Sequence, residues 1–192
     1  MFCHTVFLDI DGVLSDFCGP ALKIMGVTEE QLKKALPPGP SSFYITSPFM
    51  SDDEFWALID GVPDFWENLP KTKEADKIVE ICMKYFGKEV YLLTKPPHNP
   101  LSYAGKAVWV RKYYPQLYRS LFVGPRKHAF AHPGAVLVDD NEENCDLFCK
   151  PPNGKPGGSA VLVPRRGNSL YAKEPNLIEY VDEELKRLKY DK

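Results

Sequence analysis

Five short and strongly apolar segments, each followed by a polar or proline-containing stop, form the main pattern along the chain. They cover residues 6–8, 90–93, 121–123, 136–138 and 160–163. Segments of this length and composition are typical of strands that are buried on both faces of a parallel sheet. We therefore expect five buried, parallel strands.

Between these segments, apolar residues recur with helical spacing. The clearest case is an i, i+3, i+4, i+7 pattern made by Ala75, Ile78, Val79, Cys82, Tyr85 and Phe86. Residues 104–114 and 178–188 are also predicted to be helical, the second with one apolar face. Strands that alternate with helices predict an α/β fold with a Rossmann-like, doubly wound parallel sheet.

One long region after the first predicted strand contains no clear strand. It carries a proline-rich stretch at 36–40 and many aromatic residues. We predict that residues 17–70 form a small helical cap, and that residues 1–16 and 71–192 form the α/β core. Such a cap would lie over the carboxyl edge of the sheet, which is where ligands bind in open α/β folds.

Composition limits the function classes. The chain has 192 residues, of which 44% are hydrophobic, and a formal charge of -2. It can bury a full core, and its balanced charge argues against a nucleic-acid polymer or an anionic membrane as partner. The 5 cysteines show no framework spacing and the N-terminal segment does not resemble a secretory leader, so we expect reduced thiols and a cytoplasmic protein. A homodimer is left open.

Polar residues that are candidates for catalysis or binding follow four of the predicted strands. They are Asp9 and Asp11, Thr94, Lys127, and Asp139 with Asp140. The carboxyl ends of parallel strands share one edge of a sheet, so these groups should meet there. Crowded carboxylates repel by roughly 3 kcal/mol per pair at about 5 Å, which favours a bound hard cation such as Mg²⁺. A hydroxyl and an ammonium group would bind phosphate, and we expect carboxylates to crowd around Asp11.

Taken singly, the same residues have ordinary interpretations. Asp9 and Asp11 would be turn or cap residues after a strand, and Lys127 would be a solvated loop lysine with Arg126 as a competing candidate. The pair at 165–166, Arg-Arg, is predicted to be a solvated turn, with steering of an anionic substrate as the alternative. The order of the four signals along the chain favours one common site over these separate interpretations.

In that order, the signals resemble the four motifs of the haloacid dehalogenase (HAD) superfamily. The residues that carry the resemblance are the segment 9–13 (DIDGV), Thr94, Lys127 and the segment 136–140 (VLVDD). Within the superfamily, residues 11–17 (DGVLSDF) are similar to the 5'(3')-deoxyribonucleotidase family. Residues 103–114 (YAGKAVWVRKYY) resemble that family's YEKYAWVEKYFG helix.

The resemblance implies a magnesium-dependent phosphatase that hydrolyses (deoxy)nucleoside monophosphates through an aspartyl-phosphate. Asp9 would be the nucleophile and Asp11 the general acid/base. The implied magnesium ligands are Asp9, Asp11 and Asp140, with Asp139 in support. The implied phosphate-binding residues are Thr94, Lys95 and Lys127. The implied substrate contacts of the cap are Phe17, Phe43, Tyr44, Ile45 and Trp66.

Two departures border the substrate and leave its identity open. Lys95 follows Thr94 where the family has serine, and Asn141 follows the acidic pair where arginine is usual. The alternatives are a phosphatase for another small phosphomonoester or for a polynucleotide 3'-phosphate. Outside the enzymes, a receiver-like phosphoacceptor or a phosphate-binding module would use similar residues. In receivers, however, the acidic pair precedes the phosphoacceptor aspartate, whereas here the pair comes last.

Overall fold

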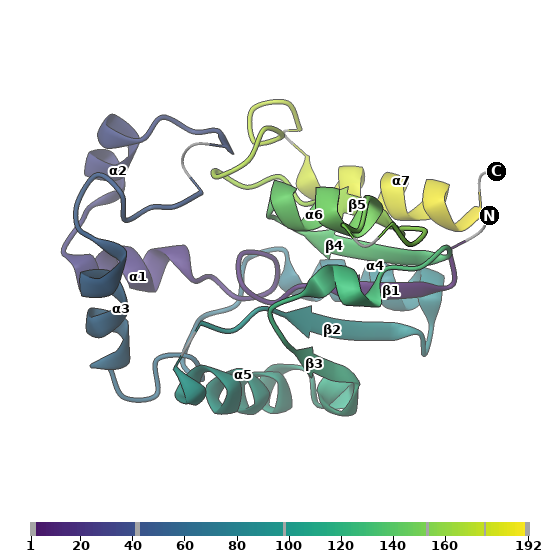
Figure 1. Ribbon diagram of the computed structural model, residues 1–192, viewed down its shortest axis with the longest axis horizontal. Coiled ribbons are helices and arrows are strands. Elements are labelled where there is room, and N and C mark those ends of the chain that lie inside the picture. Colours follow the sequence, from purple (N-terminus) through teal and green to yellow (C-terminus); the bar gives the residue numbers. More distant parts are fainter. Residues whose placement is uncertain (1–2, 41–42, 98, 153, 175, 191–192) are drawn as a thin grey trace.

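The computed structural model describes residues 3–40, 43–97, 99–152, 154–174 and 176–190, which form an α/β fold (Figure 1). The five predicted strands are confirmed. They are β1 (Thr5–Leu8), β2 (Val90–Thr94), β3 (Leu121–Val123), β4 (Ala135–Asp139) and β5 (Ser159–Leu162). All of them pair in parallel in the order β3-β2-β1-β4-β5.

The strand order places a topological switch point between β1 and β4. The chain adds β2 and β3 on one side of β1, and then β4 and β5 on the other. Leu8 lies level with Leu92 of β2 and with Val138 of β4. Residues that follow these positions therefore emerge at the same height, and a ligand crevice is expected outside a switch point of this kind.

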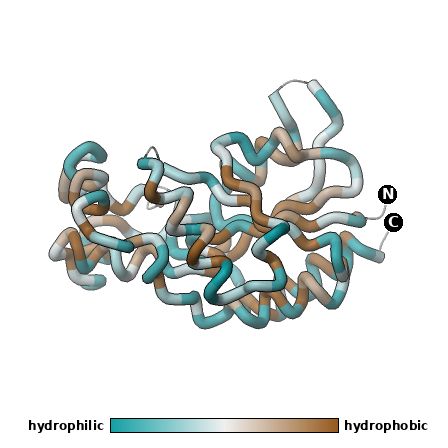
Figure 2. Tube along the Cα trace, turned by 90° about the horizontal axis from the view of Figure 1, so that it is seen from below, coloured by the Kyte–Doolittle hydropathy of each residue, from teal (hydrophilic) through white to brown (hydrophobic). Residues whose placement is uncertain are grey.

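Helices cover both faces of the sheet. They are α4 (Ala75–Phe86), α5 (Pro100–Tyr113), α6 (Glu142–Cys149), α7 (Leu177–Tyr190) and the 3₁₀ helices η2 (Pro115–Ser120) and η3 (Lys127–Phe130). The helical pattern predicted at 75–86 matches α4. Strand residues alternate between two clusters: Val6 and Leu8 pack with α4 and α7, whereas Phe7 packs with Phe148 of α6. Figure 2 shows the hydrophobic stretches gathered inside this core, with hydrophilic residues at the outer turns.

The prediction that all strands are buried on both faces is wrong for β3. This strand is at the edge of the sheet, and the side chain of Phe122 is 39% exposed. An edge strand has a neighbour on one side only, and the apolar composition of three residues does not distinguish an edge from the interior. None of the helices in the described ranges is long and apolar enough to cross a membrane.

Three short helices, α1 (Cys18–Met25), α2 (Glu29–Ala35) and α3 (Asp52–Asp60), lie between β1 and α4. Figure 1 shows them beyond the carboxyl ends of the strands, away from the two termini. Capping boxes at Thr28 and Ser51 start α2 and α3 by satisfying their first backbone N–H groups. We refer to residues 17–70 as the cap, following the division proposed from the sequence.

Candidate active site

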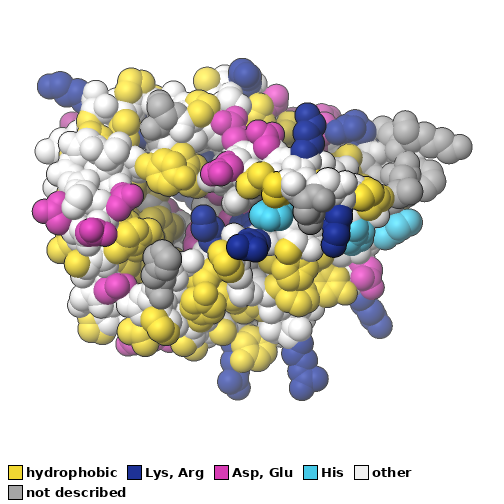
Figure 3. Space-filling view, viewed as in Figure 1, with side chains coloured by type: hydrophobic (Ala, Val, Ile, Leu, Met, Phe, Trp, Pro, Cys, Tyr) yellow, Lys and Arg dark blue, Asp and Glu magenta, His cyan; other side chains and the backbone are white. Residues whose placement is uncertain are grey.

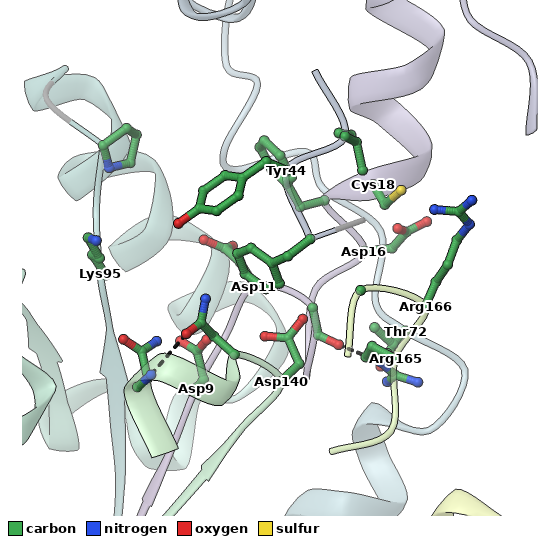
Figure 4. Close-up of a pocket in the computed structure, with 18 of the residues that line it drawn as sticks. Asp9, Asp11, Asp16, Cys18, Tyr44, Thr72, Lys95, Asp140, Arg165 and Arg166 are labelled. Atoms are coloured by element: carbon green, nitrogen blue, oxygen red, sulfur yellow. Dashed lines mark hydrogen bonds between the residues drawn. The ribbon is translucent and has the colours of Figure 1, made fainter. Parts of the chain in front are cut away.

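A cavity of about 710 Å³ lies between the strand ends and the cap. In Figure 3 a hollow is visible between the two regions, with hydrophobic side chains on the cap side and Lys or Arg side chains beside the core. Figure 4 shows Asp9, Asp11 and Asp140 close together in this cavity, with Lys95 on one side and Arg165 and Arg166 on the other. The predicted acidic residues are therefore brought to one place.

Asp9 and Lys127 form the buried centre of the site. Lys127 Nζ lies 2.7 Å from Asp9 Oδ1 and 2.6 Å from Asp139 Oδ2, and all three side chains are almost fully buried. Lys127 is the first residue of η3, which follows β3 and turns the lysine inward. Its interpretation as a solvated loop lysine is therefore wrong. Two carboxylates face one ammonium, so this triad has a net negative charge when both carboxylates are ionised.

The surroundings of Asp9 and Lys127 shift their ionisation. Burial is the main cause that raises the pKa of Asp9 to about 7. The positive charge of Lys127 lowers this pKa, whereas the negative charges of Asp139 and Asp11 raise it further. Burial alone would lower the pKa of Lys127, but Asp139 and Asp9 raise it above its ordinary value. Lys127 is thus held as a cation between two carboxylates.

The two adjacent acidic residues after β4 have different environments. Asp139 accepts hydrogen bonds from Lys127 Nζ, from the backbone N–H of Asn141 at 2.9 Å and from Asn144 Nδ2 at 3.2 Å. No hydrogen bond from the described residues reaches the carboxylate of Asp140. Burial, followed by the charges of Asp139 and Asp9, raises the pKa of Asp140 well above its ordinary value. Asp140 is therefore the carboxylate with unused acceptor capacity.

The acidic cluster fits a hard divalent cation. Asp9, Asp139 and Asp140 each offer one oxygen, and these oxygens lie within 4.8 Å of one another. Asp9 Oδ1 is buried and, apart from its ion pair with Lys127, accepts no hydrogen bond within the part of the chain that the structure describes. Carboxylate oxygens with free acceptor positions are the donors that Mg²⁺ prefers. Asp9 and Asp140 would hold the ion, with Asp139 in support.

Asp11 is not one of the three carboxylates whose oxygens lie within 4.8 Å of one another, in contrast to our expectation. Its Oδ1 accepts a hydrogen bond from Ser15 Oγ at 2.9 Å, and its Oδ2 contacts Lys106 Nζ. Lys106 also donates to Thr94 Oγ1 at 3.1 Å. A tight turn follows β1, in which Ser15 N–H donates to the carbonyl of Ile10, and this turn brings the Ser15 hydroxyl to the Asp11 carboxylate.

Lys106 was missed by the sequence reasoning. It is 1% exposed and comes from α5, not from a strand end. The signal was available, because Ser102, Lys106, Trp109 and Val110 form the buried i, i+4, i+7, i+8 face of this helix. A lysine on a buried helix face has to meet an opposite charge, and the nearest acidic loop is the one after β1.

The residues predicted for phosphate binding have unequal positions. Thr94 is fully buried at the end of β2, and Lys127 lies between Asp9 and Asp139. Lys95 is exposed and lines the cavity. The pair at 165–166 is not a solvated turn: both arginines are half-buried, and both donate hydrogen bonds to backbone carbonyls.

All five predicted cap residues line the cavity: Phe17, Phe43, Tyr44, Ile45 and Trp66. The Phe17 ring is stacked on Trp66 at 5.6 Å and also contacts Phe55, Trp56 and Phe65. Lys106 Nζ lies 4.9 Å from the Trp66 ring. The cap aromatics are thus packed on one another and reach the polar residues below through Lys106.

Solved structures share the fold. A HAD family hydrolase from Deinococcus radiodurans R1, with bound phosphate and sodium, is 10% identical over 97% of this chain and 88% of its own, with a TM-score of 0.50. A proposed phosphoglycolate phosphatase from Lactobacillus plantarum is 14% identical (93% and 92% covered, TM-score 0.49). A hydrolase from Streptococcus pneumoniae TIGR4 is 12% identical (84% and 93% covered, TM-score 0.45). The first likeness supports the fold.

The sequence comparisons give no closer relative. No family model matches the sequence, and no curated protein sequence is significantly similar to it. The chain shares its α/β fold with a HAD family hydrolase of known structure, and its acidic cluster lies at the switch point of the sheet. Its activity has to be inferred from the site itself.

Proposed function

We propose that this protein is a magnesium-dependent phosphomonoesterase that acts through an aspartyl-phosphate. The observation that carries the proposal is the position of Asp9, buried between Lys127 and the carboxylate of Asp140 and opening into a cavity of about 710 Å³. A carboxylate is a weak nucleophile, and alignment with a neutralised phosphate is what makes it effective. Lys127 supplies that neutralising charge.

In the proposed reaction, an oxygen of Asp9 attacks phosphorus in line and the ester oxygen leaves. Asp11, two positions along, carries a proton in the reactive state and gives it to the leaving oxygen. Lys106 then pairs with the carboxylate that remains. A water molecule then loses a proton to Asp11 and attacks the phosphorus of the aspartyl-phosphate. Inorganic phosphate departs, and Asp9 is regenerated. Mg²⁺, when bound, would offset the charge of the transferring phosphoryl group.

We further propose a deoxynucleoside monophosphate as the substrate. Two features support this: the resemblance of residues 11–17 to the deoxyribonucleotidase family, and the aromatic residues of the cap along the cavity. Stacking of a base on an aromatic ring contributes about 1–3 kcal/mol. A ribose 2'-hydroxyl placed against Phe17 would lose its water without gaining a partner, which costs about 1–3 kcal/mol and favours the deoxy sugar by roughly tenfold.

A phosphate-release panel tests both levels of this proposal. It would contain deoxynucleoside and nucleoside monophosphates, phosphosugars and a 3'-phosphorylated oligonucleotide, each assayed with chelator and then with added Mg²⁺. Activity that needs Mg²⁺ supports the phosphatase, and a preference for deoxy over ribo substrates supports the nucleotidase. Full activity in metal-free buffer would refute the magnesium dependence.

Two controls separate the remaining alternatives. Phe17→Leu keeps an apolar side chain in the aromatic cluster and should reduce the deoxy preference, so unchanged discrimination would refute the role of Phe17. Trapping with beryllium fluoride should give an adduct on Asp9. An adduct on Asp139 or Asp140 would instead favour a receiver-like phosphoacceptor.

A further inference from the structure

The segment 164–168, between β5 and α7, contacts both backbone stretches that carry the acidic cluster. We propose that Arg165 and Asn168 are positioning residues for the metal site, because they hold the backbone of Gly12 and the backbone of Asp140 in place relative to each other. This inference rests on the proposed function, since it concerns support of the same site. From the sequence, Asn168 had no assigned role, and the alternative for Arg165 was steering of an anionic substrate.

Arg165 holds the turn that contains Asp11. Its Nε donates to the carbonyl of Gly12 at 2.6 Å, and its Nη2 donates to the carbonyl of Val13 at 3.4 Å. Glu74 fixes the same guanidinium group through an ion pair of 3.1 Å. Because the guanidinium donors are rigidly spaced, contacts to three acceptors define the position of the turn more tightly than a single hydrogen bond would.

The position of Gly12 determines the space available to Asp140. Gly12 has a φ of +77°, and a Cβ atom added to it would lie 2.1 Å from Asp140 Oδ2. The backbone of residue 12 thus forms one wall of the place where the Asp140 carboxylate lies. A displacement of this turn by even a fraction of an ångström would change where that carboxylate can go, and with it the geometry that a divalent cation requires.

Asn168 holds the backbone of Asp140. Its side chain is 1% exposed, and Nδ2 donates to the carbonyls of Asp140 at 2.9 Å and Val163 at 2.8 Å. Its Oδ1 accepts from the backbone N–H groups of Arg165 at 3.3 Å and Leu170 at 3.2 Å. Both donors and both acceptor positions of the amide are therefore used. The hydrogen bond from Arg165 N–H to Asn168 Oδ1 links the two positioning residues directly.

The same segment also binds the cap. Arg166 Nη2 donates to the carbonyls of Leu32 and Leu36 at the end of α2, and the Arg166 carbonyl accepts from Gly39 N–H at 2.9 Å. The segment 164–168 thus has anchors on three sides: the turn after β1, the loop after β4 and the cap. An element anchored in this way is rigid, as support of a metal site demands.

Magnesium binding, measured by isothermal titration calorimetry without substrate, tests the inference. Asn168→Asp keeps the size and the acceptor oxygen but removes the donors to Asp140, and Arg165→Ala removes the hold on Gly12. Changes in residues that orient metal ligands typically weaken metal binding about 10–100-fold, and we expect losses in this range for both variants. Arg165→Lys, which keeps the charge, provides a milder variant if Arg165→Ala does not fold.

Arg187→Ala is the matched control, because Arg187 pairs with Glu184 on the exposed side of α7. It should leave the magnesium dissociation constant within about twofold of the parent protein. Millimolar guanidinium should restore binding to Arg165→Ala, which a merely structural defect would not allow. Folded Arg165 and Asn168 variants that bind Mg²⁺ as tightly as the parent would overturn the inference, and so would a parent protein that binds no Mg²⁺. If Mg²⁺ binds as expected but no phosphomonoester is hydrolysed, the proposed function fails and the positioning role stands.

Discussion

The bottom of the cavity, at the strand ends, and its top, in the cap, are built from opposite kinds of interaction. At the bottom, two lysines pair with carboxylates: Lys127 lies between Asp9 and Asp139, and Lys106 contacts Asp11. At the top, rings contact rings, with Phe17 at the centre of four aromatic contacts. The bottom is formed by strand ends whose register is fixed, and the top by loops and short helices.

Because of this difference, we expect the bottom of the cavity to determine activity and the top to contribute to stability. The carboxylates at the bottom are forced together under burial, which raises the pKa of Asp9 and of Asp140 and costs folding free energy when both are ionised. The aromatic contacts at the top each stabilise the fold by about 0.5–1.5 kcal/mol. Removing one of these crowded carboxylates should therefore abolish activity while sparing or even raising stability. Changes at the top should cost stability or substrate affinity and spare the chemistry.

The largest effect is expected for Asp9→Asn. The substitution keeps the shape of the side chain but removes the attacking charge, so turnover should fall by about 10⁴-fold or more. The measurement is kcat for the best substrate of the panel, with circular dichroism to establish that the variant is folded. Appreciable turnover by a folded variant would exclude Asp9 as the nucleophile.

Lys106→Met should have the next largest effect, because this lysine joins the bottom to the top. The substitution leaves Asp11 without its ammonium partner and Trp66 without its cation. We expect kcat/KM to fall by about 10²-fold or more, and stability to fall by about 3 kcal/mol, the usual cost of breaking a largely buried pair. Lys112→Met changes an exposed lysine of the same helix and should have neither effect. Equal behaviour of the two variants would contradict the assigned role of Lys106.

Asp140→Asn should stabilise the metal-free protein above neutral pH. Carboxylates whose folded-state pKa is raised favour folding below their unfolded pKa near 4, and that stability is lost as the pH rises through the folded value, which is about 7 for Asp9. Removing one charge from oxygens within 4.8 Å of one another relieves repulsion of about 3 kcal/mol. Each kcal/mol raises Tm by about 2–4 °C in a chain of this size.

The measurement is Tm against pH, from 5 to 9, with and without Mg²⁺. In metal-free buffer the difference between Asp140→Asn and the parent should grow between pH 5 and 8. Mg²⁺ should reverse the order, because it stabilises the parent and binds the variant weakly. A variant that is less stable than the parent throughout would show that Asp140 is not a strained carboxylate.

The strand ends could be predicted from the sequence because the signals there are local. Asp9 follows three apolar residues of a strand, and Asp139 ends another, so parallel pairing alone brings them together. Lys106 and Arg165 could not be placed in this way. Each reaches the site from an element whose position depends on packing: α5 on the sheet, and the segment after β5 on the turn at Gly12.

The cap shows a different limit of sequence reasoning. Its aromatic content predicted a ring-lined cavity, and the five selected residues do line one. The sequence could not show which of these rings pack against one another and which are exposed to the cavity. Trp66 is 5% exposed and stacked on Phe17, whereas Tyr44 is 63% exposed. Composition counts both residues equally, and only the packing separates a cap-core ring from one that is free to meet a ligand.

Tyr44→Ala should have the smallest effect and provides the sharpest test of the division between top and bottom. The Tyr44 ring lines the cavity and contacts Phe43 at 5.3 Å, but it is mostly exposed. Surface substitutions of this kind change stability by about 0.5 kcal/mol or less, so Tm should stay within about 2 °C of the parent. Loss of one stacking surface should raise KM about tenfold with kcat unchanged.

Tyr171→Ala is the control for Tyr44→Ala, since Tyr171 is 48% exposed and is not among the residues that line the cavity. It should change neither KM nor kcat. If Tyr44→Ala instead lowers kcat and leaves KM unchanged, the cap takes part in the chemical step, because interactions made only in the transition state appear in kcat. The separation between a reactive bottom and a selective top would then be wrong at the residue where it predicts the mildest change.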